Sequence, residues 1–246
     1  NNGRRPFTSG PSFYAVQPGG VCLADATGDG KLDLIGLETS TPQVWLYANQ
    51  GGGKLAAGQG TKTQYAYGLA AGDLDGDGIA DAVTTGPQVA EVLLGQKGGP
   101  FKAAVQNNIA AGQNAQLPLV ADLDGDKKNE LACVDYYSKV IGISPSNGGA
   151  TLKRVLSVYG SFGITRLLAA DMDGDGLLDL VTSNTQQNTT VEVLLGTGGL
   201  TYAMPVITKV TSMSTPIVVA DFDGDGRLDL ATWGPNTLTV LLNHCK

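Results

Sequence analysis

The apolar residues of this chain fall in short runs bounded by Gly and Asp, and the runs recur at a regular interval. In each period one run precedes an acidic segment, a second follows it, and a third leads to a glycine turn. Runs of this length and flanking composition favour strands over helices. Clear examples are 117–121, 191–195 and 238–242, and a fourth, weaker strand is expected to begin near Leu55, Phe101, Leu152 or Tyr202.

The acidic segments are five nine-residue loops that begin at Asp25, Asp73, Asp122, Asp171 and Asp221, at spacings of 48, 49, 49 and 50 residues. A four-stranded meander repeated every 40 to 50 residues is typical of propeller blades. The sequence therefore predicts an all-β fold, a five-bladed β-propeller of four-stranded antiparallel blades. Residues 1–246 would form one domain.

The two ends of the chain indicate how the ring closes. The fifth copy stops at its third strand, 238–242, whereas Pro6 and Phe7 precede the first loop much as Pro100 and Phe101 precede the third. We expect the N-terminal segment to supply the outer strand of the last blade. A fragment of a larger propeller and an open solenoid are the alternatives.

The composition argues against a disordered chain, a membrane-spanning protein and a nucleic-acid-binding protein. A hydrophobic content of 42% over 246 residues can fill a core, and no apolar run is long enough for a membrane helix. The chain begins with polar residues and no apolar signal segment, so we expect a soluble protein without membrane insertion. A net charge of -7 argues against a nucleic-acid partner.

The acidic residues are concentrated, since 19 of the 23 Asp and Glu lie in the five loops. Such clusters repel themselves unless a cation offsets the charge. Side-chain oxygens at positions 1, 3, 5 and 9 and a backbone carbonyl at position 7 suit Ca²⁺, while Mg²⁺ prefers fewer carboxylates and retained water. Position 12 carries no Glu, which excludes an EF-hand. Five filled sites would change the net charge from -7 to about +3.

The pattern predicts up to five Ca²⁺ sites. Loops 25–33 and 122–130 should bind more weakly, because Thr27 is a neutral ligand and Lys127 replaces a turn glycine, which should strain the turn of the third loop. Asp-rich turns without metal are the alternative. The predicted ligands are Asp25, Thr27, Asp29, Lys31 and Asp33; Asp73, Asp75, Asp77, Ile79 and Asp81; Asp122, Asp124, Asp126, Lys128 and Glu130; Asp171, Asp173, Asp175, Leu177 and Asp179; and Asp221, Asp223, Asp225, Arg227 and Asp229, with the seventh position acting through its carbonyl.

The unit D-x-D-G-D-G-x-x-D-L, followed by a strand, resembles the FG-GAP and VCBS repeats of integrin α-subunit propellers and propeller lectins. Residues 73–81, 171–179 and 221–229 match it at every position, and parts of the Phe-Gly and Gly-Pro elements remain at 162–163, 86–87 and 234–235. The resemblance implies a calcium-bearing β-propeller, usually extracellular, that binds ligands or cell surfaces.

Binding should use the face opposite the loops, where aromatic and amide residues gather. Aromatic rings beside amides suit a sugar, so a glycan is the expected partner and an extracellular protein surface the second. Packing between blades is the alternative for each residue, and Trp45 is expected in the core. The candidate ligand-binding residues are Tyr65, Tyr67, Tyr136, Tyr137, Tyr159, Phe162 and Trp233.

Little in the sequence points to catalysis. The single His, His244, has no partner for a triad, and the four acids outside the loops lie in different copies. We therefore expect a binding module, and leave open a calcium-containing polysaccharide lyase or hydrolase, for instance with Tyr159 and Arg166, or a purely structural adhesion repeat. Calcium loops of modest affinity favour a secreted, extracellular location. The oligomeric state is not predicted.

Overall fold

The computed structural model describes residues 18–109, 114–135, 137–153, 156–160, 163–184, 189–210, 217–234 and 237–244. All regular secondary structure in these ranges is β-strand, which confirms the all-β prediction. Within them no helix is long and apolar enough to cross a membrane.

The strands form four sheets of four antiparallel strands and one of three, each in meander order. Two further strands, β4 (Asn49–Gly51) and β5 (Lys54–Leu55), make a short hairpin. The sheets are β1 (Pro18–Ala24), β2 (Asp33–Glu38), β3 (Gln43–Tyr47) and β6 (Gln59–Lys62); β7 (Leu69–Gly72), β8 (Asp81–Gly86), β9 (Val89–Leu93) and β10 (Val105–Asn108); β11 (Ala115–Ala121), β12 (Glu130–Asp135), β13 (Val140–Pro145) and β14 (Leu156–Tyr159); β15 (Ile164–Ala170), β16 (Asp179–Asn184), β17 (Thr190–Leu194) and β18 (Val206–Lys209); and β19 (Ile217–Ala220), β20 (Asp229–Gly234) and β21 (Thr237–Leu241).

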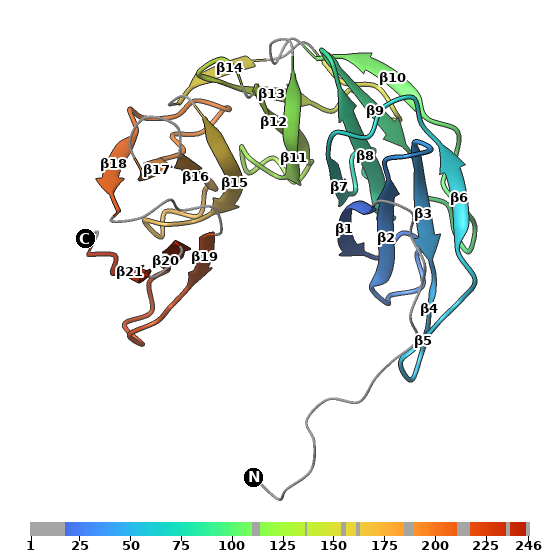
Figure 1. Cartoon of the computed structure of the whole chain (residues 1–246), viewed down its shortest axis with the longest axis horizontal. Helices are drawn as coiled ribbons and strands as arrows, with labels where there is room; N and C mark the ends of the chain where they lie inside the picture. The colour runs from blue at the N-terminus through green and yellow to red at the C-terminus, as the bar shows by residue number, and fades with distance from the viewer. Residues whose placement is uncertain are drawn as a thin grey trace, which may run out of the picture.

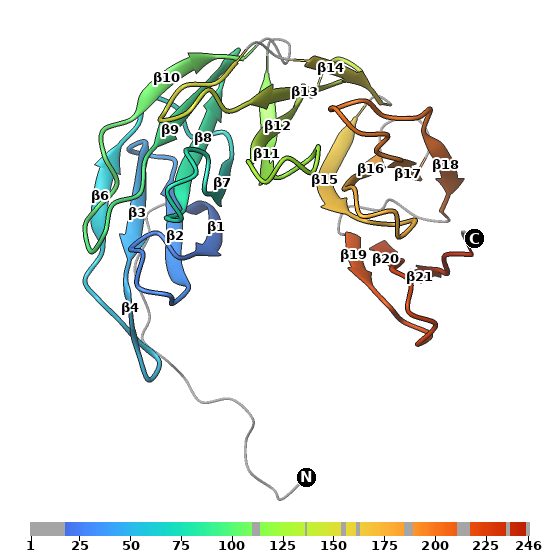
Figure 2. The same cartoon turned by 180° about the vertical axis from the view of Figure 1, so that it is seen from behind.

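The sheets stand side by side along an arc (Figures 1 and 2). The first strand of each sheet lies on the inner side of the arc, and β6, β10, β14 and β18 lie on the outer side. Inner strands touch in sequence, β1 with β7, β7 with β11 and β11 with β15. The first and last sheets do not meet within the described residues, and Pro6 and Phe7 lie outside them, so a closed five-bladed ring is not shown.

The core lies between neighbouring sheets. Each of four clusters of buried apolar residues joins two consecutive sheets. Because an interior sheet has a neighbour on each face, β8, β12 and β16 are buried along their whole length. Among the described residues the last sheet packs against one neighbour, and Val218, Leu238 and Val240 on it are exposed.

Some local expectations were wrong. The fourth strands begin about four residues later than expected, because the chain after the glycine turn first forms the hairpin partner β5 or isolated bridges to Leu152 and Tyr202. Trp45 is only partly buried. Its ring stacks on Tyr47, and its indole N–H donates to Glu38 at 3.0 Å, so a polar partner keeps it out of the core.

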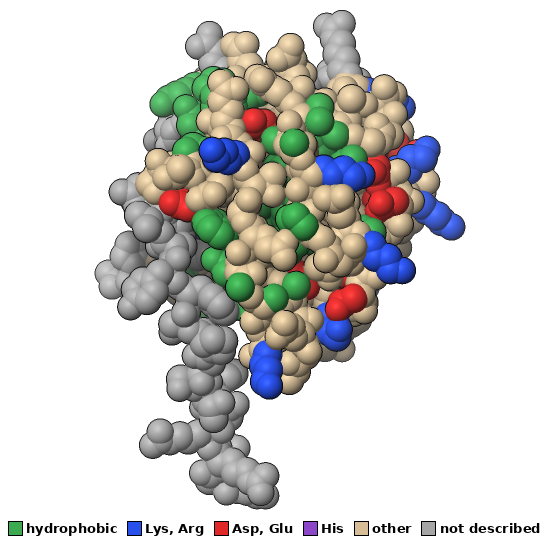
Figure 3. Space-filling model, turned by 90° about the vertical axis from the view of Figure 1, so that its right-hand side faces the viewer, with side chains coloured by type: hydrophobic (Ala, Val, Ile, Leu, Met, Phe, Trp, Pro, Cys, Tyr) green, Lys and Arg blue, Asp and Glu red, His purple; other side chains and the backbone are tan. Residues whose placement is uncertain are grey.

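The outer side of the arc, which carries β6 and β10, is shown in Figure 3. Hydrophobic side chains on this side are scattered and do not merge into one patch, and most acidic side chains have a Lys or Arg nearby. The clusters of carboxylates and the exposed aromatic side chains lie instead at the two ends of the strands.

Candidate functional site

Each acidic loop joins the first and second strands of its sheet and is folded by its own carboxylates. In the second loop, Asp73 accepts the backbone N–H groups of Gly76 at 2.7 Å and Gly78 at 2.8 Å, and Asp77 accepts that of Ile79 at 2.8 Å. The other loops repeat this pattern with small shifts. Turns of this kind are typical of Asp-rich segments.

The turn needs two residues with positive φ. Gly76 and Gly78 supply them in the second loop, at 82° and 85°. In the third loop Lys127 occupies the second position with φ 68°, a conformation that costs a residue with a side chain roughly 1–2 kcal/mol. The sequence prediction of a strained turn at Lys127 is confirmed.

The carboxylate at position nine is buried, and in four of the five loops it links the loop to the segment that follows the third strand. Asp179 is fully buried, and its two oxygens accept the N–H of Met172 and that of Gly196, both at 2.7 Å. Gly196 follows the third strand, so this one side chain ties the loop to a segment 17 residues away. Position nine therefore holds the fold together as well as offering oxygen atoms to a cation.

Burial changes the acidity of these carboxyls. Loss of solvation raises the pKa of Asp81 to about 6 and that of Glu130 to about 7, and raises the pKa of Asp179 in the same way. The pKa of Asp229 is lowered, because it accepts the N–H groups of Asn243 and Phe222. A nearby cation would favour the charged form of the raised carboxyls.

In four loops three carboxylates converge, each with one oxygen within 4.8 Å of the others. Several hard oxygens at this separation suit Ca²⁺ or Mg²⁺ rather than a soft metal. In the first loop the hydroxyl of Thr27, at position three, is buried and has no hydrogen-bond partner. The converging sets are Asp73, Asp75 and Asp81; Asp122, Asp124 and Glu130; Asp171, Asp173 and Asp179; and Asp221, Asp223 and Asp225.

Consecutive loops touch, which places them on one face of the arc. The N–H of Ala80 donates to the carbonyl of Asp25 at 2.8 Å, and the amide of Asn129 donates to that of Asp73 at 2.7 Å. The ion pairs in the described part of the chain join Lys31, Lys128 and Arg227 to Asp residues of their own loops. Exposed pairs of this kind offset little of the repulsion.

On the opposite face the predicted aromatic residues do not form one cluster. Tyr67, Tyr137 and Trp233 are 50%, 71% and 60% exposed and belong to different sheets. Tyr65 is partly buried against Gly86, where any larger residue would collide with its ring, so it serves packing. Tyr136 and Phe162 lie outside the described residues, and only the backbone of Tyr159, at the end of β14, is described.

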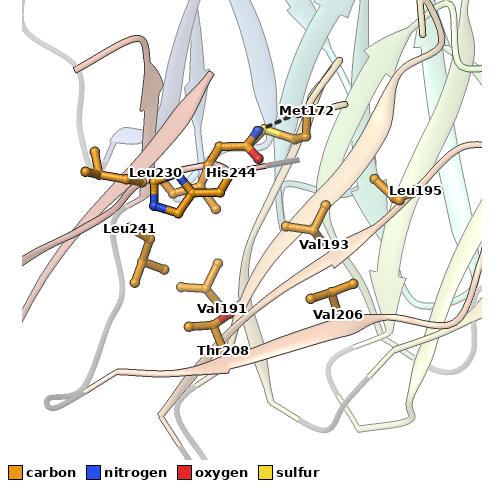
Figure 4. A pocket seen from close by; sticks show the side chains of 11 residues that line it. Met172, Val191, Val193, Leu195, Val206, Thr208, Leu230, Leu241 and His244 are labelled. Carbon is orange, nitrogen blue, oxygen red and sulfur yellow. Dashed lines mark hydrogen bonds between the residues drawn. The ribbon is translucent and has the colours of Figure 1, made fainter. Parts of the chain in front are cut away.

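An apolar cavity of about 200 Å³ lies between the fourth and fifth sheets. Figure 4 shows Val191, Val193 and Val206 facing Leu230 and Leu241 across it, with His244 at one side. This lining offers packing surface and no converging set of polar groups.

A more polar cavity of about 240 Å³ lies on the inner side of the arc. Its lining includes Tyr67, Gln116 and Arg166, from three different sheets. Of these, sequence reasoning did not single out Gln116. The signal was available next to it, since a Pro at position 118 within an apolar run indicates a bulge.

The acids outside the loops do not pair for hydrolysis. Glu38, Glu91, Asp135 and Glu192 are buried, and each belongs to a different sheet. Glu38 accepts hydrogen bonds from Trp45 and Gln43, which lower its pKa, and Glu91 accepts backbone N–H groups of the preceding segment. The carboxylates of Glu38 and Glu91 thus serve local hydrogen bonds rather than a shared catalytic site.

Comparison with known proteins agrees with this architecture. In solved structures the chain is similar to an Agrocybe aegerita lectin that recognises non-reducing terminal N-acetylglucosamine, at 22% identity and a TM-score of 0.68, over 92% of this chain and 63% of the lectin. It is also similar to the Vibrio cholerae biofilm matrix protein Bap1, at 20% identity and a TM-score of 0.54, over 93% of this chain and 38% of Bap1. The Photorhabdus luminescens Tc holotoxin pore is similar at 19% identity and a TM-score of 0.57, over 95% of this chain and 11% of the toxin chain.

These likenesses are likenesses of fold, and the chain spans less than two thirds of each of those proteins. No curated protein matches the chain. The model of the FG-GAP-like repeat matches residues 25–84, 122–182 and 171–232, which together make up most of the sequence. The chain therefore belongs to the FG-GAP-like repeat family.

Proposed function

We propose that this chain is a calcium-stabilised β-propeller that works outside the cell as a binding module, with a glycan as its favoured ligand. The observation that carries the proposal is the division between the two faces. One face gathers the carboxylate clusters, and the other leaves aromatic rings open to solvent. The fold shared with a lectin and a biofilm matrix protein supports it by analogy.

Calcium would be held by the oxygens at positions 1, 3, 5 and 9 and the carbonyl at position 7 of each loop, with Thr27 in place of an acid in the first loop. Bound calcium supplies positive charge that offsets the repulsion between neighbouring carboxylates. The chain's own residues hold the loop in shape through hydrogen bonds from the backbone. Solvent-exposed loops of this kind suit the high calcium concentrations found outside cells.

The ring is proposed to close with five blades, and the apolar cavity supports this. At the first interface, Phe101 packs with Val44 and Leu46 of β3 and Leu93 of β9. Leu152 and Tyr202 contribute to the next two interfaces. The equivalent positions at the fourth interface, Val191, Val193 and Leu241, line the cavity. Phe7 precedes its acidic loop by 18 residues, and Tyr202 precedes the next loop by 19, so Phe7 is the side chain proposed to fill it.

A substitution tests the closure. Phe7→Ala should lower the free energy of unfolding by about 3 kcal/mol or more, the usual cost of removing a buried Phe. Thr8→Ala, one residue along, is the matched control and should change little. Urea unfolding in calcium measures both. Equal stability of the two variants would refute closure by this segment and favour an open or larger assembly.

A sugar ligand is favoured over a protein surface because the exposed rings are separate rather than joined in one apolar patch. Tyr137 and Trp233 each offer one face to a pyranose ring. A large protein interface usually contains a continuous apolar centre. An extracellular protein surface is therefore the second partner class.

Of the two enzymatic alternatives, a polysaccharide lyase has more support than a hydrolase, because Tyr67 and Arg166 line the same cavity while the carboxylates outside the loops are separated. A glycan array with the calcium-loaded chain, combined with an assay for unsaturated products on acidic polysaccharides, separates these functions. Binding without turnover supports the module. Unsaturated products would show that the chain is a lyase instead. No binding and no product would contradict both the glycan-binding function and the lyase function.

A further inference from the structure

The polar cavity lies at the same level on four neighbouring inner strands. Val21, Leu69, Pro118 and Leu167 all line it, and each stands four residues before the acidic loop of its sheet. At about 3.3 Å per residue, this places the cavity roughly 13 Å from the loops along the strands. The cavity is therefore a feature of the inner side of the arc, separate from the candidate metal sites.

The inner strands are irregular at this level. Pairing shifts between Gln116 and Leu119 in β11, between Ile164 and Arg166 in β15, and between Pro18 and Gly20 in β1. Leu117, inside the β11 irregularity, has a φ of 50°, which a residue with a side chain rarely adopts. Bulges turn side chains out of the regular alternation of a strand. Three of the four strands thus depart from ladder geometry where they meet the cavity.

Close backbone contact fixes the cavity wall. A side chain at Gly68 would collide with the ring of Pro118, so only glycine lets β7 approach β11 this closely. The N–H of Tyr67 donates to the carbonyl of Thr85 at 2.9 Å, which holds the start of β7 against β8. Tyr67, half exposed, is therefore carried on a fixed piece of backbone.

The polar groups in the lining suit a ligand that carries both hydroxyls and a carboxylate. Arg166 is exposed and donates one N–H to the carbonyl of Thr165 at 2.9 Å, and none of the ion pairs of the described residues involves it. A guanidinium offers two parallel N–H donors to a carboxylate. Gln116 offers an amide, and the Tyr67 ring offers a face for stacking.

The charge distribution favours the same ligand class. The 19 loop carboxylates lie at the other end of the strands, and the acids outside the loops are buried in their sheets. Within the ranges that the structure describes, no exposed acidic side chain therefore lies close to Arg166, so an anionic sugar meets the guanidinium without a competing negative charge. The volume of about 240 Å³ lies below the roughly 300–1,000 Å³ of common ligand pockets, which suits a single ring.

We propose that this cavity binds one carboxylate-bearing monosaccharide unit, such as a uronic acid residue, with Arg166 on the carboxylate, Gln116 on a hydroxyl and Tyr67 against the ring. This site deepens the proposed glycan-binding function and rests on it.

Calorimetric titration of the full chain in calcium tests the site with two probes, methyl β-D-glucuronide and its neutral counterpart, methyl β-D-glucoside. The glucuronide should bind at least tenfold more tightly. Arg166→Gln should remove that preference and leave glucoside binding unchanged, while Tyr67→Ala should weaken both. Lys62→Gln, which removes a charge from an outer strand, should preserve the preference. Unchanged melting temperatures establish that the variants are folded.

The same variants on a glycan array distinguish this site from the wider function. If glycans bind and neither Arg166→Gln nor Tyr67→Ala alters the pattern, the binding module stands and this cavity is not its site. If neither the array nor the two probes give binding, the site and the glycan function both fail. Equal affinity for the two probes would refute the carboxylate assignment.

Discussion

The face that carries the acidic loops and the inner side that carries the polar cavity differ in how far they repeat. From the second loop to the fifth, the first position accepts the backbone N–H groups of the fourth and sixth positions, with Asp73 and Asp171 as close equivalents. At the cavity each strand contributes something different, a tyrosine, an amide or a guanidinium. Repetition is what a scaffold needs, because every blade must meet its neighbour in the same way. Recognition of an asymmetric ligand needs different residues on neighbouring strands. The repeated loops and the varied cavity residues lie at different positions along the same inner strands.

The strongest test of this comparison is calcium removal, which should act on the repeated face alone. At a calcium concentration 100 times Kd, each filled site adds about 2.7 kcal/mol to the stability of the folded chain. One kcal/mol shifts the melting temperature of a chain of this size by about 2–4 °C. Excess chelator should therefore lower the melting temperature by about 5–10 °C for each strong site lost. Calorimetry with calcium, magnesium and chelator measures it.

Magnesium serves as the control for that experiment, since it should restore only part of the loss. An unchanged melting curve in chelator would show that the carboxylate clusters are tolerated without metal. The loops would then be Asp-rich turns, and their repetition would reflect the turn alone.

A second test separates two roles within one loop. Asp179→Ala leaves the buried N–H groups of Met172 and Gly196 without acceptors, at about 1–3 kcal/mol each. This variant should be destabilised by about 2–6 kcal/mol even in chelator. Asp173→Ala removes an exposed carboxylate that accepts one N–H, from Asp175 at 3.2 Å, so it should change stability by under about 1 kcal/mol in chelator. Denaturant unfolding with and without calcium measures the pair.

The contrast between the variants is the informative quantity. Asp173→Ala should lose part of the stabilisation that calcium adds, because a ligand is missing. If both variants fall equally in chelator, position three is structural as well. If neither variant loses stability in chelator, the hydrogen bonds of Asp179 contribute little to folding. The acidic residue at position nine of the loops then serves metal binding alone.

The sequence predicted the repeated face better than the cavity. Strand order, the position of each loop and the strain at Lys127 follow from local chemistry that recurs every 48 to 50 residues. The second role of Asp179 could not be predicted, because its partner Gly196 belongs to a segment beyond the neighbouring strand. Pro118 signals the irregularity in β11, but its contact with Gly68 of another sheet could not be predicted, because it exists only once the sheets have packed together. Periodicity predicts what each blade does for itself, whereas contacts between blades require the assembled structure.

The third and smallest expected effect is a pH dependence that reverses with calcium. Burial raises the pKa of Glu130 from 4.5 to about 7, so between these values the metal-free folded chain binds more protons than the unfolded chain. Its stability should fall as pH rises through this window, and Asp81 adds the same trend up to about pH 6. The melting temperature in chelator should thus drop by a few degrees from pH 5 to pH 7.5.

Glu130→Gln isolates the contribution of that side chain. Its amide oxygen can still accept the N–H of Leu123, which Glu130 accepts at 2.9 Å, but it no longer titrates. The variant in chelator should show a flatter curve than the parent chain, and the downward slope that remains near pH 6 includes the titration of Asp81. With calcium the parent chain should show the opposite slope, because ionised carboxylates bind the cation and protonated ones do not. A parent chain with the same downward slope in calcium would mean that the third loop binds no metal, and the repeated face would then consist of loops with unequal roles.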